Sequence, residues 1–379
     1  MPNRSGALPH QTIVELCELG RISGAAPTSI QAASLDPTLS NECFQVEGDF
    51  FPTERQTVRE ALAELHATPH DLSQPLARGA TYAIRCNETL TLPKSVYALG
   101  NAKSSSGRNN LLARFIVDRM PRYDLLPRGY TGELWLLAQP GSFNTKLSPG
   151  IALTQLRFFN RDTRFDELEL DMRLERDGLL WSKAGQRLGM DDARVSDEDG
   201  SIILTLDLSG TVAGYEALDT GRVLDFSKLG AYQPEDFFRP LYRRDGRISL
   251  MANGFYILLT QECVRVPAHL ACEMDAVDVR SGQFITHRAG FIDPGWGWGT
   301  QGEGLGKQLV CEVVPFRDLV MREGQALAKV RFERLTEPTD QPYNGNYTRQ
   351  RTPRLSKHFV APAEERTTQP TPATVAAKA

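Results

Sequence analysis

The sequence lacks paired cysteines and long apolar runs, and both absences narrow the class of protein. Its six cysteines occur singly and no Cys-x-x-Cys is present, which excludes a disulfide-stapled scaffold and a thiolate metal site. No apolar stretch approaches membrane-spanning length, and the N-terminus has no apolar secretory core. We therefore expect a cytoplasmic protein without a membrane partner.

The sequence also has little excess charge of either sign. The formal net charge is −4 over 379 residues, and no basic stripe indicates nucleic acid as a partner. A small polyanion needs only a local cluster of Lys and Arg, so phosphate ligands stay open. With 41% apolar residues the chain can bury ordinary cores, and its length allows two domains.

An internal repeat explains the length. The segment Gly150–Phe158 matches Gly324–Phe332 at five of nine positions, with an offset of 324 − 150 = 174 residues. The same offset relates three further residues of the first half to three of the second, namely Tyr82, Glu88 and Pro93 to Tyr256, Glu262 and Pro267. We interpret the chain as two tandem copies of one β-domain.

Local patterns predict short strands with a few short helices. Apolar residues at helical spacing predict helices within residues 10–20 and 55–68. Alternation of apolar and polar residues predicts strands within residues 82–96, 130–138 and 201–208. The fold class is therefore all-β dominated.

The repeat also predicts the domain boundaries. We place the first domain, called the first half below, at residues 1–160. The second domain, or second half, spans residues 161–360, and a disordered tail rich in Pro, Thr and Ala follows at residues 361–379. Matching Leu206-Asp207 to Leu35-Asp36 puts the start of the second domain near residue 161.

Candidate chemistry is concentrated in residues 286–312. The turn Gly290–Trp296 carries an acid and an indole, and a strand-like apolar run after it contains one carboxylate, Glu312. Such a glutamate is paired with a basic residue, catalytic, or on a wet strand face. Taken alone, Asp293-Pro294-Gly295 also fits an ordinary turn, and Trp296 a core aromatic.

A second polar stretch, Lys103–Arg108, follows a predicted strand of the first half. It reads Lys-Ser-Ser-Ser-Gly-Arg, and by composition it fits a solvated turn. A third stretch, Pro342–Gln350, carries Tyr347 and Gln350 at the spacing Tyr-x-x-Gln. By composition it fits a polar tail with two aromatic residues.

These stretches resemble the trimeric dUTPase and dCTP deaminase superfamily, in a tandem-duplicated form. Gly290–Trp296 is similar to its sugar-binding turn, Lys103–Arg108 to its Arg-Ser-Ser-x-x-Arg motif, and Pro342–Gln350 to the deaminase segment that closes over the triphosphate. Ile30–Leu39 resembles the opening Ile-x-x-x-Ser-x-Asp-x-x-Leu of dCTP deaminases. The resemblance implies two tandem dUTPase-like domains with distorted β-barrel or jelly-roll folds. Lys103 departs from the pattern, because it keeps the charge of Arg without its planar fork.

The resemblance also implies residue roles. Glu312 activates the attacking water, while Ser104 and Arg108 position it. The implied substrate-binding residues are Lys103, Ser105, Arg288, Ala289, Asp293, Trp296, Tyr347 and Gln350. Among them, Asp293 accepts from the sugar 3′-hydroxyl, and Trp296 leaves no room for a 2′-hydroxyl.

The two halves lack different parts of this set. Leu136, Leu137 and Ala138 occupy the first half's counterpart of the glutamate position. Residues 277–282 of the second half lack the paired hydroxyls of the motif. We therefore predict one composite site with parts from both halves, which meet either within one chain or between chains.

The implied reaction is hydrolysis of dCTP to dUTP and ammonia in dUTP and dTTP biosynthesis. It uses Mg²⁺ carried on the triphosphate and no zinc, with dTTP as an inhibitor and a homo-oligomer of trimer-type packing. Zinc-dependent cytidine deaminases need His-x-Glu and Pro-Cys-x-x-Cys, and neither occurs here. Two alternatives stay open: a dUTP diphosphatase or bifunctional enzyme with an Asp base in the sugar turn, and a non-catalytic dNTP-binding sensor with eroded motifs.

Overall fold

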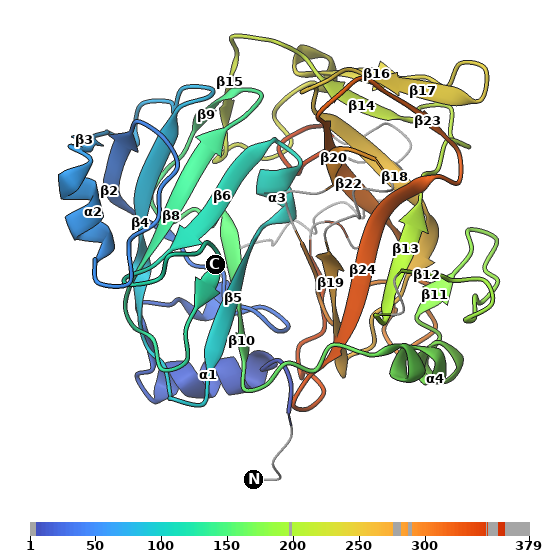
Figure 1. Ribbon diagram of the computed structural model, residues 1–379, viewed down its shortest axis with the longest axis horizontal. Coiled ribbons are helices and arrows are strands. Elements are labelled where there is room, and N and C mark those ends of the chain that lie inside the picture. The colour runs from blue at the N-terminus through green and yellow to red at the C-terminus, as the bar shows by residue number, and fades with distance from the viewer. Residues whose placement is uncertain are drawn as a thin grey trace, which may run out of the picture.

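The computed structural model describes residues 5–196, 199–275, 282–286, 290–345, 347 and 355–360. It is mostly β, and its two halves form two lobes that lie side by side, the first in blue to green and the second in yellow to red (Figure 1). The expected all-β-dominated fold is confirmed. No helix among the described residues is long and apolar enough to cross a membrane.

The elements of the first half are, in chain order, α1 (His10–Glu18), β1 (Ile22–Ser23), the 3-10 helix η1 (Pro27–Ser29), β2 (Leu39–Val46), α2 (Val58–Glu64), β3 (Thr68–Pro69), β4 (Thr81–Thr91), β5 (Tyr97–Ala102), α3 (Ser104–Gly107), β6 (Leu111–Ile116), β7 (Leu125–Leu126), β8 (Thr131–Pro140), β9 (Asn144–Lys146) and β10 (Thr154–Phe159).

The elements of the second half are α4 (Glu167–Asp177), β11 (Leu180–Trp181), β12 (Arg194–Ser196), β13 (Ser201–Thr205), β14 (Gly214–Ala217), β15 (Val223–Asp225), the 3-10 helix η2 (Pro234–Asp236), β16 (Phe238–Leu241), β17 (Arg247–Leu250), β18 (Tyr256–Val264), β19 (Leu270–Asp275), β20 (Phe284–Thr286), β21 (Phe291–Ile292), β22 (Lys307–Pro315), β23 (Leu319–Arg322) and β24 (Ala326–Arg334).

The helices predicted near both ends of residues 10–68 are present. In α1 the buried residues Ile13 and Leu16 form the expected apolar side. The helix α2 begins with a capping box, in which Thr57 accepts from the backbone of Glu60 and the Glu60 carboxylate accepts from the backbone of Thr57. This reciprocal pair stabilises the start of a helix of only seven residues.

Two sheets face each other in the first half. One has the strand order β3-β2-β4-β8-β6, with β1 paired to β4, and the other has the order β10-β5-β7. Because side chains alternate between the two faces of a strand, one face of each sheet supplies the core between them. That core includes Tyr82, Ile84, Leu136, Leu156 and Phe158.

The second half repeats this arrangement. Its sheets have the orders β16-β14-β18-β22-β20 and β12-β13-β24-β19-β21, with β11 paired to β18 and a separate β17-β23 pair. The core between them includes Tyr256, Leu258, Cys311, Val330 and Phe332. These are the counterparts of the five first-half residues named above, because β4 pairs with β8 in the same register as β18 with β22.

The repeat extends to individual hydrogen bonds. The Tyr82 hydroxyl accepts from the backbone of Ala77 at 3.0 Å, and the Tyr256 hydroxyl accepts from the backbone of Met251 at 2.7 Å. The two donors are again separated by 251 − 77 = 174 residues. The offset read from the sequence is therefore present in the structure.

One sequence match is wrong. Leu35 pairs with Leu156, whereas Ile202 pairs with Val330, and 330 − 156 = 174. The counterpart of Leu35-Asp36 is therefore Ile202-Ile203, four residues before the predicted Leu206-Asp207. The second half has no acid at this place, and a Leu-Asp pair that serves another turn lies just beyond it. In that turn the Asp207 carboxylate accepts from Ser209 and Lys183.

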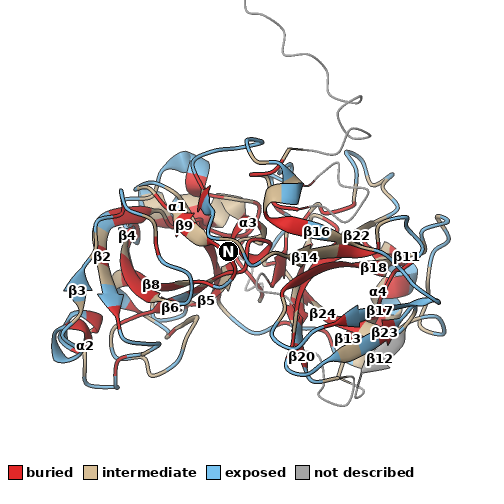
Figure 2. Ribbon diagram, turned by 90° about the horizontal axis from the view of Figure 1, so that it is seen from above, coloured by how far each residue is buried: buried red, intermediate tan, exposed pale blue. Residues whose placement is uncertain are grey.

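The two halves are joined by shared core and by main-chain pairing. Strand β9 of the first half pairs in parallel with β15 of the second. An apolar cluster with members from both halves includes Phe159, Phe291 and Leu335. Buried residues continue from each lobe into the junction between them (Figure 2). The halves therefore form one packed unit, which allows a site to be built between them.

Candidate active site

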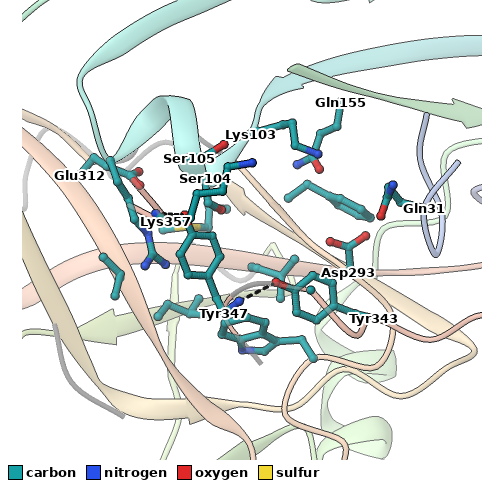
Figure 3. Close-up of a pocket in the computed structure, with 18 residues that line it drawn as sticks. Gln31, Lys103, Ser104, Ser105, Gln155, Asp293, Glu312, Tyr343, Tyr347 and Lys357 are labelled. Atoms are coloured by element: carbon teal, nitrogen blue, oxygen red, sulfur yellow. Dashed lines mark hydrogen bonds between the residues drawn. The ribbon is translucent and has the colours of Figure 1, made fainter. Parts of the chain in front are cut away.

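A pocket of about 140 Å³ lies at the junction of the two halves (Figure 3). The first half contributes Gln31, Lys103, Ser104, Ser105, Arg108 and Gln155. The second half contributes Met274, Phe291, Ile292, Asp293, Trp296, Leu309, Val310, Glu312, Tyr343, Gly345, Tyr347 and Lys357. The parts that the sequence divides between the halves therefore meet within one chain.

The Lys103–Arg108 motif lies at the end of β5 and forms the single turn α3. Lys103 has extended backbone and precedes the turn, and the buried Ser106 hydroxyl donates to the carbonyl of Leu153 at 2.8 Å. This bond ties the turn to the chain just before β10. The neighbouring Ser104 and Ser105 then line the pocket. The interpretation of this stretch as a solvated turn is wrong, since Ser105 is only 5% exposed.

Arg108 is held by an aromatic residue of the other half. Its guanidinium lies 4.0 Å from the centre of the Tyr347 ring, and both residues are buried. Stacking on an aromatic face suits the planar guanidinium and fixes its direction. The backbone of Tyr347 in turn donates to the Tyr343 hydroxyl at 3.4 Å, shown by the dashed line in Figure 3. This part of the predicted closing segment thus packs over the motif.

Glu312 lies in the middle of β22, opposite Ile257 of β18. Alternation along the strand puts it on the same face as Val310, and Val310 packs into the core of the first half. Glu312 is 2% exposed and lines the pocket, with α3 on the other side of the cavity (Figure 3). A carboxylate held in this way is in a suitable place to exchange protons with a small molecule in the pocket.

The turn after β21 supplies two polar atoms that have no hydrogen-bond partner among the described residues. These are the buried Oδ1 of Asp293 and the indole Nε1 of Trp296. Burial raises the pKa of Asp293 to about 7, and the charge of Asp36 raises it further. Buried polar atoms without partners are costly, so the turn is suited to binding a ligand with hydroxyl or carbonyl groups.

A cluster of charges lies beside this turn. Lys103 forms an ion pair with Asp36, which is mostly buried. Burial raises the pKa of Asp36, and the Lys103 charge lowers it in part. Lys357 belongs to the same cluster, since its charge also acts on Asp36. Two ammonium groups therefore converge near one carboxylate.

Sequence reasoning missed four pocket residues: Gln31, Gln155, Tyr343 and Lys357. Gln31 and Tyr343 lie within stretches that the resemblance had singled out, so a signal for them was present. Gln155 lies on β10, where the repeat was read only as a structural match. Lys357 follows the last motif by seven residues, and no pattern in the sequence marks it.

Some predicted positions fall outside the described residues. Arg288, Ala289 and Gln350 are among them, as is most of the 277–282 stretch. Every other predicted site residue lines the pocket. Among the described residues, no group of three or more His, Cys, Asp or Glu is arranged to hold a metal ion.

Comparisons with known proteins point in one direction. Residues 4–162 match the model of the 2′-deoxycytidine 5′-triphosphate deaminase N-terminal domain, and residues 177–359 match that of the C-terminal domain of the same family. The structure is similar to the crystal structure of 2′-deoxycytidine 5′-triphosphate deaminase from Agrobacterium tumefaciens. The identity is 30% and the TM-score is 0.81, over 89% of this chain and 97% of that one. A comparison with curated proteins gave no match.

Proposed function

The chain belongs to the 2′-deoxycytidine 5′-triphosphate deaminase family of hydrolytic deaminases, and we propose that it converts dCTP and water to dUTP and ammonia in the pocket between its halves. The observation that carries the proposal is the meeting of Glu312 with the Lys103–Arg108 motif in one cavity. Each half alone lacks part of this set, and the pocket supplies both parts.

In the proposed reaction Glu312 carries protons. Its carboxylate takes a proton from water while the water oxygen adds to C4 of the cytosine ring, and the proton passes to N3. The carboxylate then moves the second proton from the new C4 hydroxyl to the amino group. The C4–N bond breaks, ammonia leaves, and the C4 carbonyl of uracil forms. A carboxylate that serves as base and then as acid must keep within hydrogen-bond reach of both atoms, and the rigid middle of β22 provides this.

Ser104 and Arg108 act from the opposite wall. Ser104 orients the water for attack, and Arg108 stabilises the charge that builds on the ring adduct. The stacking of Arg108 on Tyr347 supports this role, because it limits the directions that the guanidinium can take. Lys103 and Ser105 are proposed to bind phosphate oxygens, with Arg288, Tyr347 and Gln350 closing over them.

The sugar turn selects deoxyribose in this proposal. Asp293 accepts from the 3′-hydroxyl, which gives its unpartnered Oδ1 a hydrogen bond. Trp296 lies against the sugar where a 2′-hydroxyl would project, and the backbone of Ala289 helps to hold the water or the base. Mg²⁺ arrives on the triphosphate, as part of the substrate.

The remaining parts of the proposal concern the cell. We keep a cytoplasmic location, a supply of dUTP for dTTP biosynthesis and a homo-oligomer of trimer-type packing. We also keep dTTP as an inhibitor, because dTTP carries the same deoxyribose and triphosphate that the pocket is proposed to bind.

The test follows all products separately. The purified protein is incubated with Mg²⁺ and dCTP, then with dUTP, and ammonia, dUTP, dUMP and pyrophosphate are measured. Ammonia and dUTP formed from dCTP, and lost in Glu312→Gln, are the expected result. Pyrophosphate released from dUTP would instead indicate a diphosphatase or bifunctional enzyme, and nucleotide binding without any product would indicate a sensor.

A further inference from the structure

The segment Leu355–Val360, near the C-terminal end of the chain, packs against the first half and the linker that joins the halves. Leu355 and Phe359 belong to the core cluster of the first half. The Phe359 ring contacts those of Phe237 and Phe238 at centroid distances of 5.5 and 5.4 Å. The backbone of Val360 donates to the carbonyl of Tyr232 at 2.9 Å. The segment is therefore a built part of the fold.

A buried polar cluster fixes the centre of this segment to the end of α3. The Ser356 hydroxyl donates to the Asn109 side-chain oxygen at 2.9 Å, and the Asn109 amide donates to His358 Nδ1 at 3.0 Å. The same Asn109 amide donates to the carbonyl of Ser105 at 2.8 Å. All three side chains are at most 2% exposed. Burial lowers the pKa of His358 to about 4, so its ring is neutral at pH 7 and can accept this bond.

Lys357 lies between the two clamped residues, and its side chain lines the pocket (Figure 3). Its ammonium group is partly desolvated, since burial lowers its pKa and the charge of Lys103 lowers it further. The only carboxylate that acts on it is Asp36, which already pairs with Lys103. The described part of this cluster thus has two cations for one anion, and an anionic ligand would balance the surplus charge.

We propose that Lys357 is a further phosphate-binding residue of the pocket, and that Asn109, Ser356 and His358 position it there. The inference rests on the proposed function in one respect, because it takes the anion to be the triphosphate of a nucleotide. The cluster joins Lys357 to the same turn that carries Ser104 and Ser105, so both phosphate-binding elements move as one unit. His358 and Ser356 touch no substrate in this arrangement and act only through Lys357.

The test compares ligands that do and do not carry phosphates. Binding of dCTP, of inorganic tripolyphosphate and of deoxycytidine is measured for the wild type, Lys357→Met, Lys357→Arg and Ser356→Ala. Lys357→Met is expected to weaken dCTP and tripolyphosphate binding by about tenfold or more, with deoxycytidine unchanged. In turnover, KM for dCTP rises while kcat stays within about twofold. Lys357→Arg restores most of the affinity, since it keeps the charge.

The positioning role has its own readout. Ser356→Ala is expected to show the same selective loss for phosphate-bearing ligands, and to add nothing when combined with Lys357→Met. An equal loss for deoxycytidine, or additive losses, would mean that the cluster only supports the fold. The exposed Lys228→Met serves as the matched control and leaves all three affinities unchanged.

The inference and the proposed function can fail separately. A wild type that deaminates dCTP while Lys357→Met binds dCTP as tightly as the wild type overturns only the inference. A wild type that does not deaminate dCTP, but loses tripolyphosphate affinity in Lys357→Met, overturns the proposed reaction and supports the phosphate-binding role.

Discussion

The two halves of the molecule share one strand framework but differ in what covers the same face of it. In the second half, this face of β22 carries Glu312 and packs against the first half. The register of the strands makes Leu137 on β8 the counterpart of Glu312. There the face is covered by α2, and Leu137 packs with Val58 and Leu62. A site persists where the face meets another half, and a core replaces it where a local helix covers it.

The sugar turn shows the same difference. Strand β7 pairs with β5 as β21 pairs with β19, and Tyr130 donates to the Pro127 carbonyl as Trp296 donates to that of Asp293. The first half therefore keeps the turn but has Pro127 in place of the acid. Both carboxylates of the proposed chemistry are missing from this half, while the backbone that would present them remains.

The largest expected effect separates Glu312 from Leu137. Glu312→Gln should lower kcat for dCTP deamination by about a thousandfold or more, because the amide cannot take a proton from water. The matched variant Leu137→Met keeps the core volume and should leave kcat unchanged. Ammonia release at saturating dCTP measures both, and a Glu312→Gln enzyme with more than a tenth of wild-type activity would remove Glu312 from the mechanism.

The next effect concerns the two turns. Asp293→Ala should raise KM for dCTP by about tenfold to a hundredfold, because the sugar hydroxyl loses a charged acceptor. Pro127→Ala, at the same place in the first half, should leave KM unchanged. Steady-state kinetics with both variants checks this, and equal KM changes would show that the turns are not functionally different.

A third prediction uses the titration of Asp293. Its pKa of about 7 means that the carboxylate form dominates above pH 7 and the protonated form below it. If the carboxylate binds the sugar, kcat/KM should fall by about tenfold for each pH unit below 7. Asp293→Asn has no such group, so the profile of this variant should lack that limb. An unchanged profile in the variant would assign the titration to another group.

The smallest effect compares a feature that both halves have kept. The Glu88 carboxylate accepts from the backbone and hydroxyl of Thr38, at 2.9 Å each, and Glu262 accepts from the same atoms of Thr205, at 2.7 Å each. Glu88 is fully buried, whereas Glu262 is partly exposed. Glu88→Ala should therefore lower the free energy of unfolding by about 1 kcal/mol more than Glu262→Ala, because water replaces the partner less readily. Urea denaturation of both variants measures the difference.

The sequence predicted the repeat and most of the pocket because these depend on local patterns. Alternation located β4 and β8, and the motifs located Lys103–Arg108, Asp293 and Glu312. The match of Leu206-Asp207 failed because a Leu-Asp pair is common, and only strand pairing identifies Ile202 as the counterpart of Leu35. Lys357 could not be predicted, since its place in the pocket depends on buried contacts between segments more than 200 residues apart: 356 − 109 = 247.

The placement of α3 and β22 in opposite halves of one chain has a consequence for assembly. A covalent link holds the two parts at an effective concentration that free halves would reach only near the millimolar range. If the chain were cut between β10 and α4, activity would depend on the encounter of two fragments and would fall steeply on dilution. A single translation product also delivers the two parts in equal number. Each copy of the duplicated domain is therefore free to lose one part of the site, but neither can be inherited without the other.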